Sequence, residues 1–330
     1  MANVRQNQLA EARVLVATSR YEEAMRIYAE MCVREPMNSQ IFKEMLDVRA
    51  HLISIKSAAE TMKLQHDANV LEGKAFIADL LKDGKYDDPR RLERAGYKVY
   101  SQHDEDGIIA EIFRRIGTRN RAFFVFGVET GLECNTHFLL HSSWKGVWAE
   151  ANRDHFASIR SQFGQAIASG QLKPIERMIT KDNINQIIGE MALPSDLDLM
   201  SIDIDFNDYW IFKALDAAQP RVMIVEYNAK FPPPIRRVVP YNRDRAWDGT
   251  DYCGCSLRSL SDLAVSKGYN LVGCNITGVN AFFVRAELCA DLFATPATAE
   301  HLYQPPRYEL FHMGAFEVGH PGSFGHWLDI

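Results

Sequence analysis

Apolar residues follow two different periodicities along this chain, and the change falls near residue 95. After that point, short apolar runs rich in β-branched and aromatic residues alternate with segments of helical spacing at 183–191, 208–217 and 256–267. This alternation is typical of a parallel sheet whose strands are joined by crossover helices. The runs that we expect to be strands lie at 122–128, 146–152, 173–180, 197–205, 221–228, 271–275 and 281–285.

The last two of these runs are separated by only a few residues around Gly278. Such a connection is too short for a right-handed crossover, so the two strands should pair antiparallel. We therefore predict an α/β fold: a Rossmann-like, doubly wound, seven-stranded sheet with one antiparallel edge strand, preceded by an α-helical N-terminal region. The expected domains are a helical region over 1–95 and an α/β domain with a C-terminal tail over 96–330.

The N-terminal region has helical periodicity and almost no strand signal. The spacing of Ala24, Tyr28, Met31 and Pro36 resembles the second helix of a tetratricopeptide repeat. One repeat cannot bury its own apolar face, so residues 41–64 should supply further packing helices. Two interpretations stay open, a helical cap or dimerisation arm and a docking surface for a protein partner. The charged segment 83–94 is expected to be a linker.

Composition narrows the class of protein further. The chain has 330 residues, with 37 Lys and Arg against 43 Asp and Glu, a net charge of −6 that argues against a dedicated nucleic-acid binder. No apolar run approaches the ~18 residues that a membrane span needs, and the N-terminus lacks the apolar core of a signal peptide. Six cysteines are few for a disulfide framework. We expect a cytoplasmic protein.

The first predicted strand runs into Gly127 and Gly131, and a helix should follow from about Asn135. Glycines let the backbone approach a ligand closely, and a helix N-terminus offers free amides. The second strand ends near Glu150, roughly 20 residues later, where an acid can accept both hydroxyls of a ribose. Together these features predict an adenosine-containing ligand. The alternative is a tight turn beside a surface glutamate.

Carboxylates gather at the ends of two later strands. Asp203, Asp205 and Asp208 follow the fourth run, and Glu226 and Asn228 follow the fifth. Asp203 and Asp205 should point to the same face of their strand. Clustered carboxylates repel one another unless one is protonated or a cation binds, and oxygen ligands suit Mg²⁺ or another divalent ion. The alternative is that Asp205 or Asp208 caps the next helix.

The order of five segments resembles the class I S-adenosylmethionine-dependent methyltransferases, and most closely the FkbM-like set. The resemblance covers residues 98–288 and not the helical front. The segments are 100–109 (YSQHDEDGII), 126–131 (FGVETG), 146–150 (GVWAE), 201–210 (SIDIDFNDYW) and 225–228 (VEYN).

The resemblance implies a cofactor site. The methionine part of S-adenosylmethionine would lie in the loop of Gly127, Glu129, Thr130 and Gly131, and its ribose at Glu150. The remaining cofactor residues implied are Ala151, Asn152, Thr180 and Asn183 beside the ribose and adenine, Asp203 near the sulfonium, and Gln102 closing over the cofactor. These families usually carry an acid two positions before the first glycine. This chain has Val125 there, so Glu129 would have to contact the cofactor's amino group.

These observations predict a methyltransferase that methylates a hydroxyl on a sugar, a glycan or a small natural product. Asp203 and Asp205 are the candidate catalytic residues, with His141 as an alternative base. Asp203, Glu226 and Asn228 are the candidate metal ligands. The long segment 231–254, which is rich in Arg, Asp and aromatic residues, is expected to form an acceptor pocket or lid.

Two other functions stay open at this point. Asp203-Ile-Asp205 resembles the Asp-x-Asp element of metal-dependent glycosyltransferases. A catalytically silent adenosine-binding scaffold would account for Val125.

Overall fold

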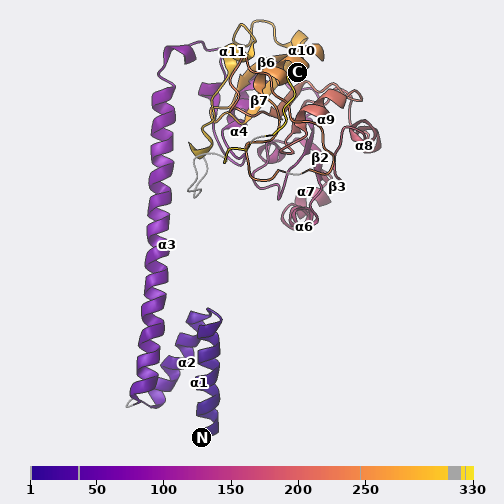
Figure 1. Cartoon of the computed structure of the whole chain (residues 1–330). Helices are drawn as coiled ribbons and strands as arrows, with labels where there is room; N and C mark the ends of the chain where they lie inside the picture. The colour runs from indigo at the N-terminus through magenta and orange to yellow at the C-terminus, as the bar shows by residue number, and fades with distance from the viewer. Residues whose placement is uncertain (1, 36–37, 246, 311–320, 324) are drawn as a thin grey trace. The chain divides into compact units, whose positions relative to one another are not determined.

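The computed structural model describes residues 2–35, 38–245, 247–310, 321–323 and 325–330. The chain divides into two compact units, Met1–Glu72 and Gly73–Ile330 (Figure 1). Pro36, which belongs to the predicted tetratricopeptide-like spacing, lies outside the described residues. No helix within the described ranges is long and apolar enough to cross a membrane.

The first unit is helical, as predicted. Helices α1 (Ala2–Ala17) and α2 (Tyr21–Arg34) pack with the first part of α3 (Ser39–Leu80). Ala24, Tyr28 and Met31 are the buried side chains of α2, so the predicted spacing does form its packing face. The Tyr28 hydroxyl also donates to Glu44 on α3 at 2.8 Å. The likeness to a tetratricopeptide repeat stays a prediction.

The second unit is built on a seven-stranded sheet in the order β3-β2-β1-β4-β5-β7-β6. Strand β7 runs antiparallel to β5 and β6, and the other pairs are parallel, so the predicted mixed sheet is confirmed. The reversed strand lies one place in from the β6 edge. The strands are β1 (Ala122–Phe126), β2 (Lys145–Glu150), β3 (Leu172–Glu176), β4 (Leu199–Ile202), β5 (Val222–Glu226), β6 (Tyr269–Cys274) and β7 (Asn280–Arg285).

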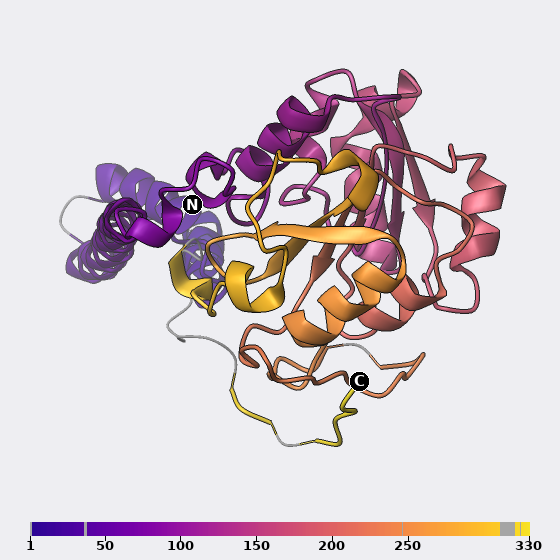
Figure 2. The same cartoon turned by 90° about the horizontal axis from the view of Figure 1, so that it is seen from above.

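Both faces of the sheet are covered, which explains why the central strands are continuously apolar. Helices lie on both sides of the sheet (Figure 2). Along β1, Phe124 and Phe126 join one core with helices α8, α9 and α10, while Phe123 and Val125 join a second core with α4, α5 and α6. The helices are α4 (Glu105–Ile116), α5 (His137–Leu140), α6 (Arg153–Gln162), α7 (Gly164–Ala168), α8 (Ile184–Met191), α9 (Asp208–Ala214), α10 (Leu257–Ser266) and α11 (Ala299–Leu302), with short 3₁₀ turns at Gly84–Tyr86, Glu93–Ala95, Ala286–Leu288 and Tyr308–Leu310.

The expectation of a linker over 83–94 is wrong. Tyr86 and Leu92 are fully buried in the second unit, and the Tyr86 hydroxyl donates to Gln304 at 3.0 Å. Arg91 and Glu93 form an ion pair that is almost entirely buried. The charges that suggested a solvated segment are neutralised in pairs, so the segment packs as part of the α/β body.

Candidate functional site

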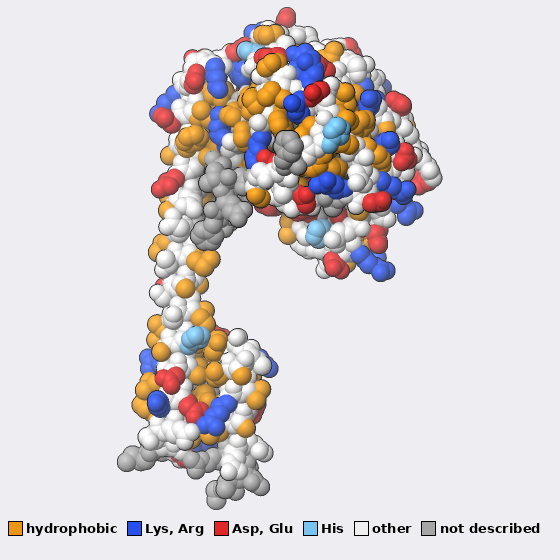
Figure 3. All heavy atoms as spheres, in the orientation of Figure 1, with side chains coloured by type: hydrophobic (Ala, Val, Ile, Leu, Met, Phe, Trp, Pro, Cys, Tyr) orange, Lys and Arg blue, Asp and Glu red, His pale blue; other side chains and the backbone are white. Residues whose placement is uncertain are grey.

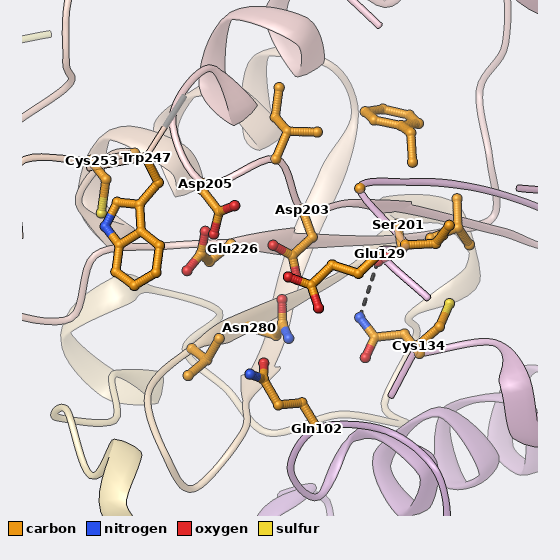
Figure 4. A pocket seen from close by; sticks show the side chains of 18 of the residues that line it. Gln102, Glu129, Cys134, Ser201, Asp203, Asp205, Glu226, Trp247, Cys253 and Asn280 are labelled. Carbon is orange, nitrogen blue, oxygen red and sulfur yellow. Dashed lines mark hydrogen bonds between the residues drawn. The ribbon is translucent and has the colours of Figure 1, made fainter. Parts of the chain in front are cut away.

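A cavity of about 580 Å³ opens at the carboxyl ends of β1, β2, β4 and β5 (Figure 4). In a doubly wound sheet this edge is where ligands bind, because the strand order reverses between β1 and β4. The cavity is lined by most of the predicted site residues. These are Gln102, Gly127, Glu129, Thr130, Glu150, Ala151, Asn152, Asp203, Asp205, Glu226 and Asn228.

The glycines of the loop after β1 are required by packing. Gly127 has φ +75°, and a Cβ at this position would overlap the Asp203 carbonyl oxygen of the β4 loop. Gly131 has φ +78°, and a Cβ there would overlap the indole of Trp148. Gly127 lines the cavity, whereas Gly131 does not. The loop is therefore tight because it passes close to β4 and β2.

Glu150 links the chain segments that follow β1 and β2 through hydrogen bonds. Its Oε2 accepts the backbone N–H of Glu129 at 2.8 Å, and its Oε1 accepts the backbone N–H of Asn152 at 2.7 Å. The side chain is 7% exposed and lines the cavity. A carboxylate oxygen has two acceptor sites, so each oxygen retains capacity for a ligand hydroxyl. The Asn152 side chain caps α6 by accepting from two backbone amides.

The third strand contributes to the cavity through residues other than those predicted. β3 ends at Glu176, earlier than expected, and Arg177, Met178 and Ile179 form the wall. Thr180 and Asn183 do not line the cavity. The Thr180 backbone N–H instead donates to Asn183 Oδ1 at 2.8 Å, which closes the turn before α8.

The acidic cluster forms as predicted, but not by strand alternation. β4 ends at Ile202, so Asp203 and Asp205 lie in the loop beyond it, and Asp205 adopts a left-handed φ of +64°. Asp203, Asp205 and Glu226 each bring a carboxylate oxygen within 4.8 Å of the others. Figure 4 shows these carboxylates converging on the cavity, with Glu129 beside Asp203.

The negative charges of the carboxylates in this cluster repel one another when no cation is bound. Burial, followed by the charges of Asp205 and Asp208, raises the pKa of Asp203 well above its ordinary value. Burial and the neighbouring aspartates likewise raise the pKa of Glu226, and burial with the charge of Glu129 raises that of Asp205. A cationic ligand would relieve this repulsion.

Asp208 lies behind the cluster and supports it. Its Oδ1 accepts the backbone N–H of Ile204 at 2.8 Å, and its Oδ2 is buried with no hydrogen-bond partner among the described residues. Burial raises the pKa of Asp208 to about 7. Neither Asp205 nor Asp208 caps α9, whose N-cap residue is Asn207.

Asn228 lines the cavity, but its amide shapes the adjoining loop. The Nδ2 group donates to the carbonyl oxygens of Asp251 and Cys253 at 2.8 and 3.1 Å, and Oδ1 accepts the backbone N–H of Lys230 at 3.1 Å. Both ends of this amide therefore bond to the loop that follows β5, and its oxygen keeps one further acceptor site.

The long segment after β5 lines the far wall of the cavity, and its use as an acceptor pocket or lid stays a prediction. Lys230 and Asp251 line it and form an ion pair at 3.2 Å. The guanidinium of Arg245 lies 4.9 Å from the ring centroids of both Phe206 and Tyr252. Trp247 also lines this wall and is 40% exposed.

Gln102 and Val125 complete the cavity on its other side. The segment that carries Gln102 is held by Asp106, whose Oδ2 accepts three backbone amides from residues 99–101. His141, the alternative base, is outside the lining residues and stacks on Tyr100 with a ring separation of 5.3 Å.

Sequence reasoning missed Asn280, Arg177, Met178 and Tyr308, all of which line the cavity. Asn280 had a usable signal. It is the first residue of the antiparallel strand, and a strand that runs opposite to its neighbour begins at the edge where that neighbour ends. Tyr308 had no such signal, because only the tertiary path of the tail brings it to this edge.

Comparison with known proteins places methyltransferases among the similar structures. An O-methyltransferase from Bacillus cereus in complex with S-adenosylhomocysteine is 15% identical, with 66% of this chain and 89% of that chain covered at a TM-score of 0.36. An S-adenosylmethionine-dependent methyltransferase from Clostridium acetobutylicum is 12% identical, with 64% of this chain and 98% of that chain covered at a TM-score of 0.35. One from Aquifex aeolicus is 11% identical, with 64% of this chain and 97% of that chain covered at a TM-score of 0.33.

In three other matched structures this chain spans only 54 to 62% of the matched chain's length. No protein-family model matches the sequence, and no curated protein matches it either. The TM-scores of the three methyltransferase structures named above all lie below 0.5, so the likenesses do not establish the function of this chain.

Proposed function

We propose that this chain is an S-adenosylmethionine-dependent methyltransferase that methylates a hydroxyl group of a sugar, a glycan or a small natural product, with help from a divalent cation. One observation supports this most directly. A single cavity extends from Glu150 at the end of β2, past the Gly127 loop, to the acidic cluster at the ends of β4 and β5. It offers an adenosine subsite and an anionic subsite on one continuous wall.

The methyl donor carries two positive charges, on its amino group and its sulfur, and would supply an activated methyl group. Glu150 would accept the ribose hydroxyls, and the wall of Arg177, Met178 and Ile179 would contact the base. Glu129 and Asp203 would face the two positive charges. In the families that this sequence resembles, an acidic residue at the position of Val125 contacts the amino group of the donor, and here Glu129 would make that contact. Gln102 would cover the methionine part.

The chemistry asks little of the protein beyond alignment and the exclusion of water. The acceptor oxygen would attack the methyl carbon, and the carbon–sulfur bond would break with its electron pair passing to sulfur. The acceptor's hydroxyl proton would pass to Asp203 or Asp205. In the absence of the cation, burial and neighbouring charge raise the pKa of these carboxylates and make them better bases than solvated ones.

Divalent-cation assistance is the finer part of the proposal. Asp203, Asp205 and Glu226 supply three carboxylate oxygens within 4.8 Å of one another, a donor set suited to Mg²⁺, Mn²⁺ or Ca²⁺. The cation would neutralise the cluster and lower the pKa of an acceptor hydroxyl. Asn228 is a weaker candidate than the sequence suggested, because its amide is committed to the loop.

A sugar or another polyhydroxylated acceptor is supported by the far wall. Lys230 and Asp251 present opposite charges there, and Trp247 offers a partly exposed aromatic surface. Such a wall combines hydrogen-bonding groups with a ring that can stack on a sugar.

Calorimetry tests the proposal. The full chain should bind S-adenosylmethionine and S-adenosylhomocysteine with one site, and saturating ligand should raise its melting temperature. Nucleotide sugars are the matched control, because they are the donors of the glycosyltransferase alternative. Absence of donor binding would refute the proposal. Donor binding without methyl transfer to any polyhydroxylated acceptor would favour the silent scaffold.

We also propose that the helical unit pairs two copies of the chain. Ile41, Met45, Val48 and Leu52 of α3 pack against α1 and α2. The same spacing continues at Ile55, Ala59 and Met62, of which Ile55 and Met62 are 46% and 69% exposed. Such a seam is typical of a coiled coil. Figure 3 shows apolar side chains on the surface of this unit.

Light scattering tests the pairing. The native chain should have the mass of a dimer, and Ile55→Glu combined with Met62→Glu should yield a monomer that still binds the methyl donor. A monomeric native chain would refute the pairing and leave the methyltransferase proposal untouched.

A further inference from the structure

Asn280 places an amide against the acidic cluster. It is the first residue of β7 and pairs directly with Glu226, the last residue of β5. Its side chain is 2% exposed and lines the cavity. In Figure 4 it lies between Gln102 and the carboxylates, with its amide oxygen facing Asp203 and Glu226.

The orientation of this amide is fixed from behind by Glu105. Asn280 Nδ2 donates to Glu105 Oε1 at 3.0 Å, and Asn275 Nδ2 donates to the same oxygen at 2.8 Å. The Glu105 Oε2 accepts the backbone N–H of His103 at 2.8 Å. Turning the Asn280 amide over would bring two oxygens together, so its Oδ1 must face the cavity.

The Oδ1 of Asn280 is buried and has no hydrogen-bond partner in the described part of the chain. A buried carbonyl oxygen without a donor costs about 1–3 kcal/mol. The side chains that face it, Asp203 and Glu226, are themselves acceptors when ionised. Water in the cavity or a proton on one carboxyl group can satisfy these oxygens singly, whereas a cation can satisfy all of them together.

We propose that Asn280 Oδ1 is the fourth protein oxygen of the divalent-cation site, with Asp203, Asp205 and Glu226. This inference rests on the cation part of the proposed function and adds a residue to it. Three carboxylates and one neutral carbonyl oxygen form a donor set for Mg²⁺, Mn²⁺ or Ca²⁺, with water completing the coordination. Glu105 acts as the positioning residue, since it holds the amide with its oxygen forward.

The amide occupies the position for which the sequence suggested Asn228. Both asparagines stand at the carboxyl edge of the sheet, but their surroundings differ. Both the nitrogen and the oxygen of the Asn228 amide form hydrogen bonds with the loop that follows β5. In Asn280, the amide nitrogen donates to Glu105, and the amide oxygen faces the cavity without a hydrogen-bond partner among the described residues.

The test is metal binding by the full chain in the absence of methyl donor. Mn²⁺ is the probe, counted by electron paramagnetic resonance and titrated by calorimetry, with Mg²⁺ as competitor. The native chain should bind one Mn²⁺. Asn280→Ala, which removes the oxygen, should weaken Mn²⁺ binding by about tenfold or more. Asn280→Asp combined with Glu105→Gln keeps an oxygen towards the cavity, adds charge and offers an amide donor to the second oxygen, so this double variant should bind at least as tightly as the native chain.

Three controls make the result decisive. Circular dichroism and binding of S-adenosylhomocysteine confirm that each variant is folded. Asn270→Ala, on the neighbouring strand β6 and outside the cavity lining, should leave Mn²⁺ binding unchanged. Glu105→Gln replaces one of the two acceptor oxygens of Glu105 by an NH₂ group, so it holds the Asn280 amide less firmly. This variant should weaken Mn²⁺ binding less than Asn280→Ala.

The outcomes separate this inference from the function it rests on. Equal Mn²⁺ affinity in the native chain and Asn280→Ala would overturn the assignment of Asn280 and leave the cation at the three carboxylates. No Mn²⁺ binding by the native chain would overturn both the assignment and the cation. Neither result would touch the methyltransferase proposal, which depends on donor binding measured separately.

Discussion

Glu150 Oε2 accepts the backbone N–H of Glu129 at 2.8 Å, so the acid at the end of β2 holds the loop that follows β1. The same carboxylate lines the cavity where a ribose would bind. Under the proposed function, donor binding and the shape of the loop would be coupled through this one side chain, and a substitution there should affect both.

Glu150→Ala should weaken binding of S-adenosylhomocysteine at least about tenfold, because it removes the ribose acceptor and releases the Glu129 amide. Calorimetry measures the binding. Glu176→Ala is the matched control, since Glu176 pairs with Glu150 in the β2–β3 register but lies outside the cavity. Unchanged binding in Glu150→Ala would remove the ribose assignment.

Gly127→Ala should destabilise the fold by roughly 3 kcal/mol or more, through its left-handed φ and overlap with the Asp203 carbonyl. Gly117→Ala separates these causes, because Gly117 has φ +68° but open space around it. Gly117, at φ +68° and ψ 166°, lies in a region that essentially only glycine adopts, so that control should cost about 1–3 kcal/mol from the backbone alone. Urea unfolding provides both values, and equal costs would show that the close approach to β4 contributes nothing.

The stability of the chain should fall between about pH 4 and pH 8 because of Asp104. Burial, together with the charge of Glu105, raises the pKa of Asp104 to about 8 in the folded state. The folded state therefore holds this proton more tightly than the unfolded state, where the pKa is near 3.9. Stability is fully retained below about pH 4 and is lost as the pH rises to about 8, by a few kcal/mol.

Asp104→Asn removes this titration. The difference in unfolding free energy between Asp104→Asn and the native chain should move in favour of the variant by a few kcal/mol between pH 5 and pH 9. Urea unfolding at both values measures it. If the two pH profiles run parallel, Asp104 does not carry the effect.

Asp198 anchors the opposite end of the sheet. It is fully buried, accepts the backbone N–H groups of residues 119–121, and pairs with Arg221 at 2.6 Å. Asp198→Ala should cost about 3–5 kcal/mol, because it leaves Arg221 buried without its partner. Asp196→Ala, which removes an ion pair with the exposed Arg119, should cost less than about 1 kcal/mol. Denaturation measures both, and similar costs would contradict this account.

Much of the fold follows from local pattern. All seven predicted strands exist, because runs buried on both faces of a sheet are continuously apolar, and the short connection around Gly278 required an antiparallel pair. Strand ends were less predictable. β3 and β4 stop at Glu176 and Ile202, several residues before their apolar runs end, since the chain must turn there towards the next helix.

The candidate site was predictable in its chemistry and not in all of its geometry. Asp203, Asp205 and Glu226 do meet, but through a left-handed turn at Asp205 that no periodicity encodes. The same limit applies to Asn228 and Asn280, which are alike as residue types. The Asn228 oxygen accepts the backbone N–H of Lys230, two residues further on, whereas Glu105, which is distant in sequence, turns the Asn280 oxygen towards the cavity.

The sequence by itself determined a helical front, a seven-stranded mixed sheet and a row of acids at its carboxyl edge, because these depend on the spacing of apolar residues and on where runs end. Only the tertiary structure decided that residues 83–94 pack into the body, that the glycines of the first loop are needed by β4 and Trp148, and that Asn280 faces the acids. Those outcomes depend on contacts between residues far apart in the chain, where burial and unsatisfied hydrogen bonds, not periodicity, set the free energy.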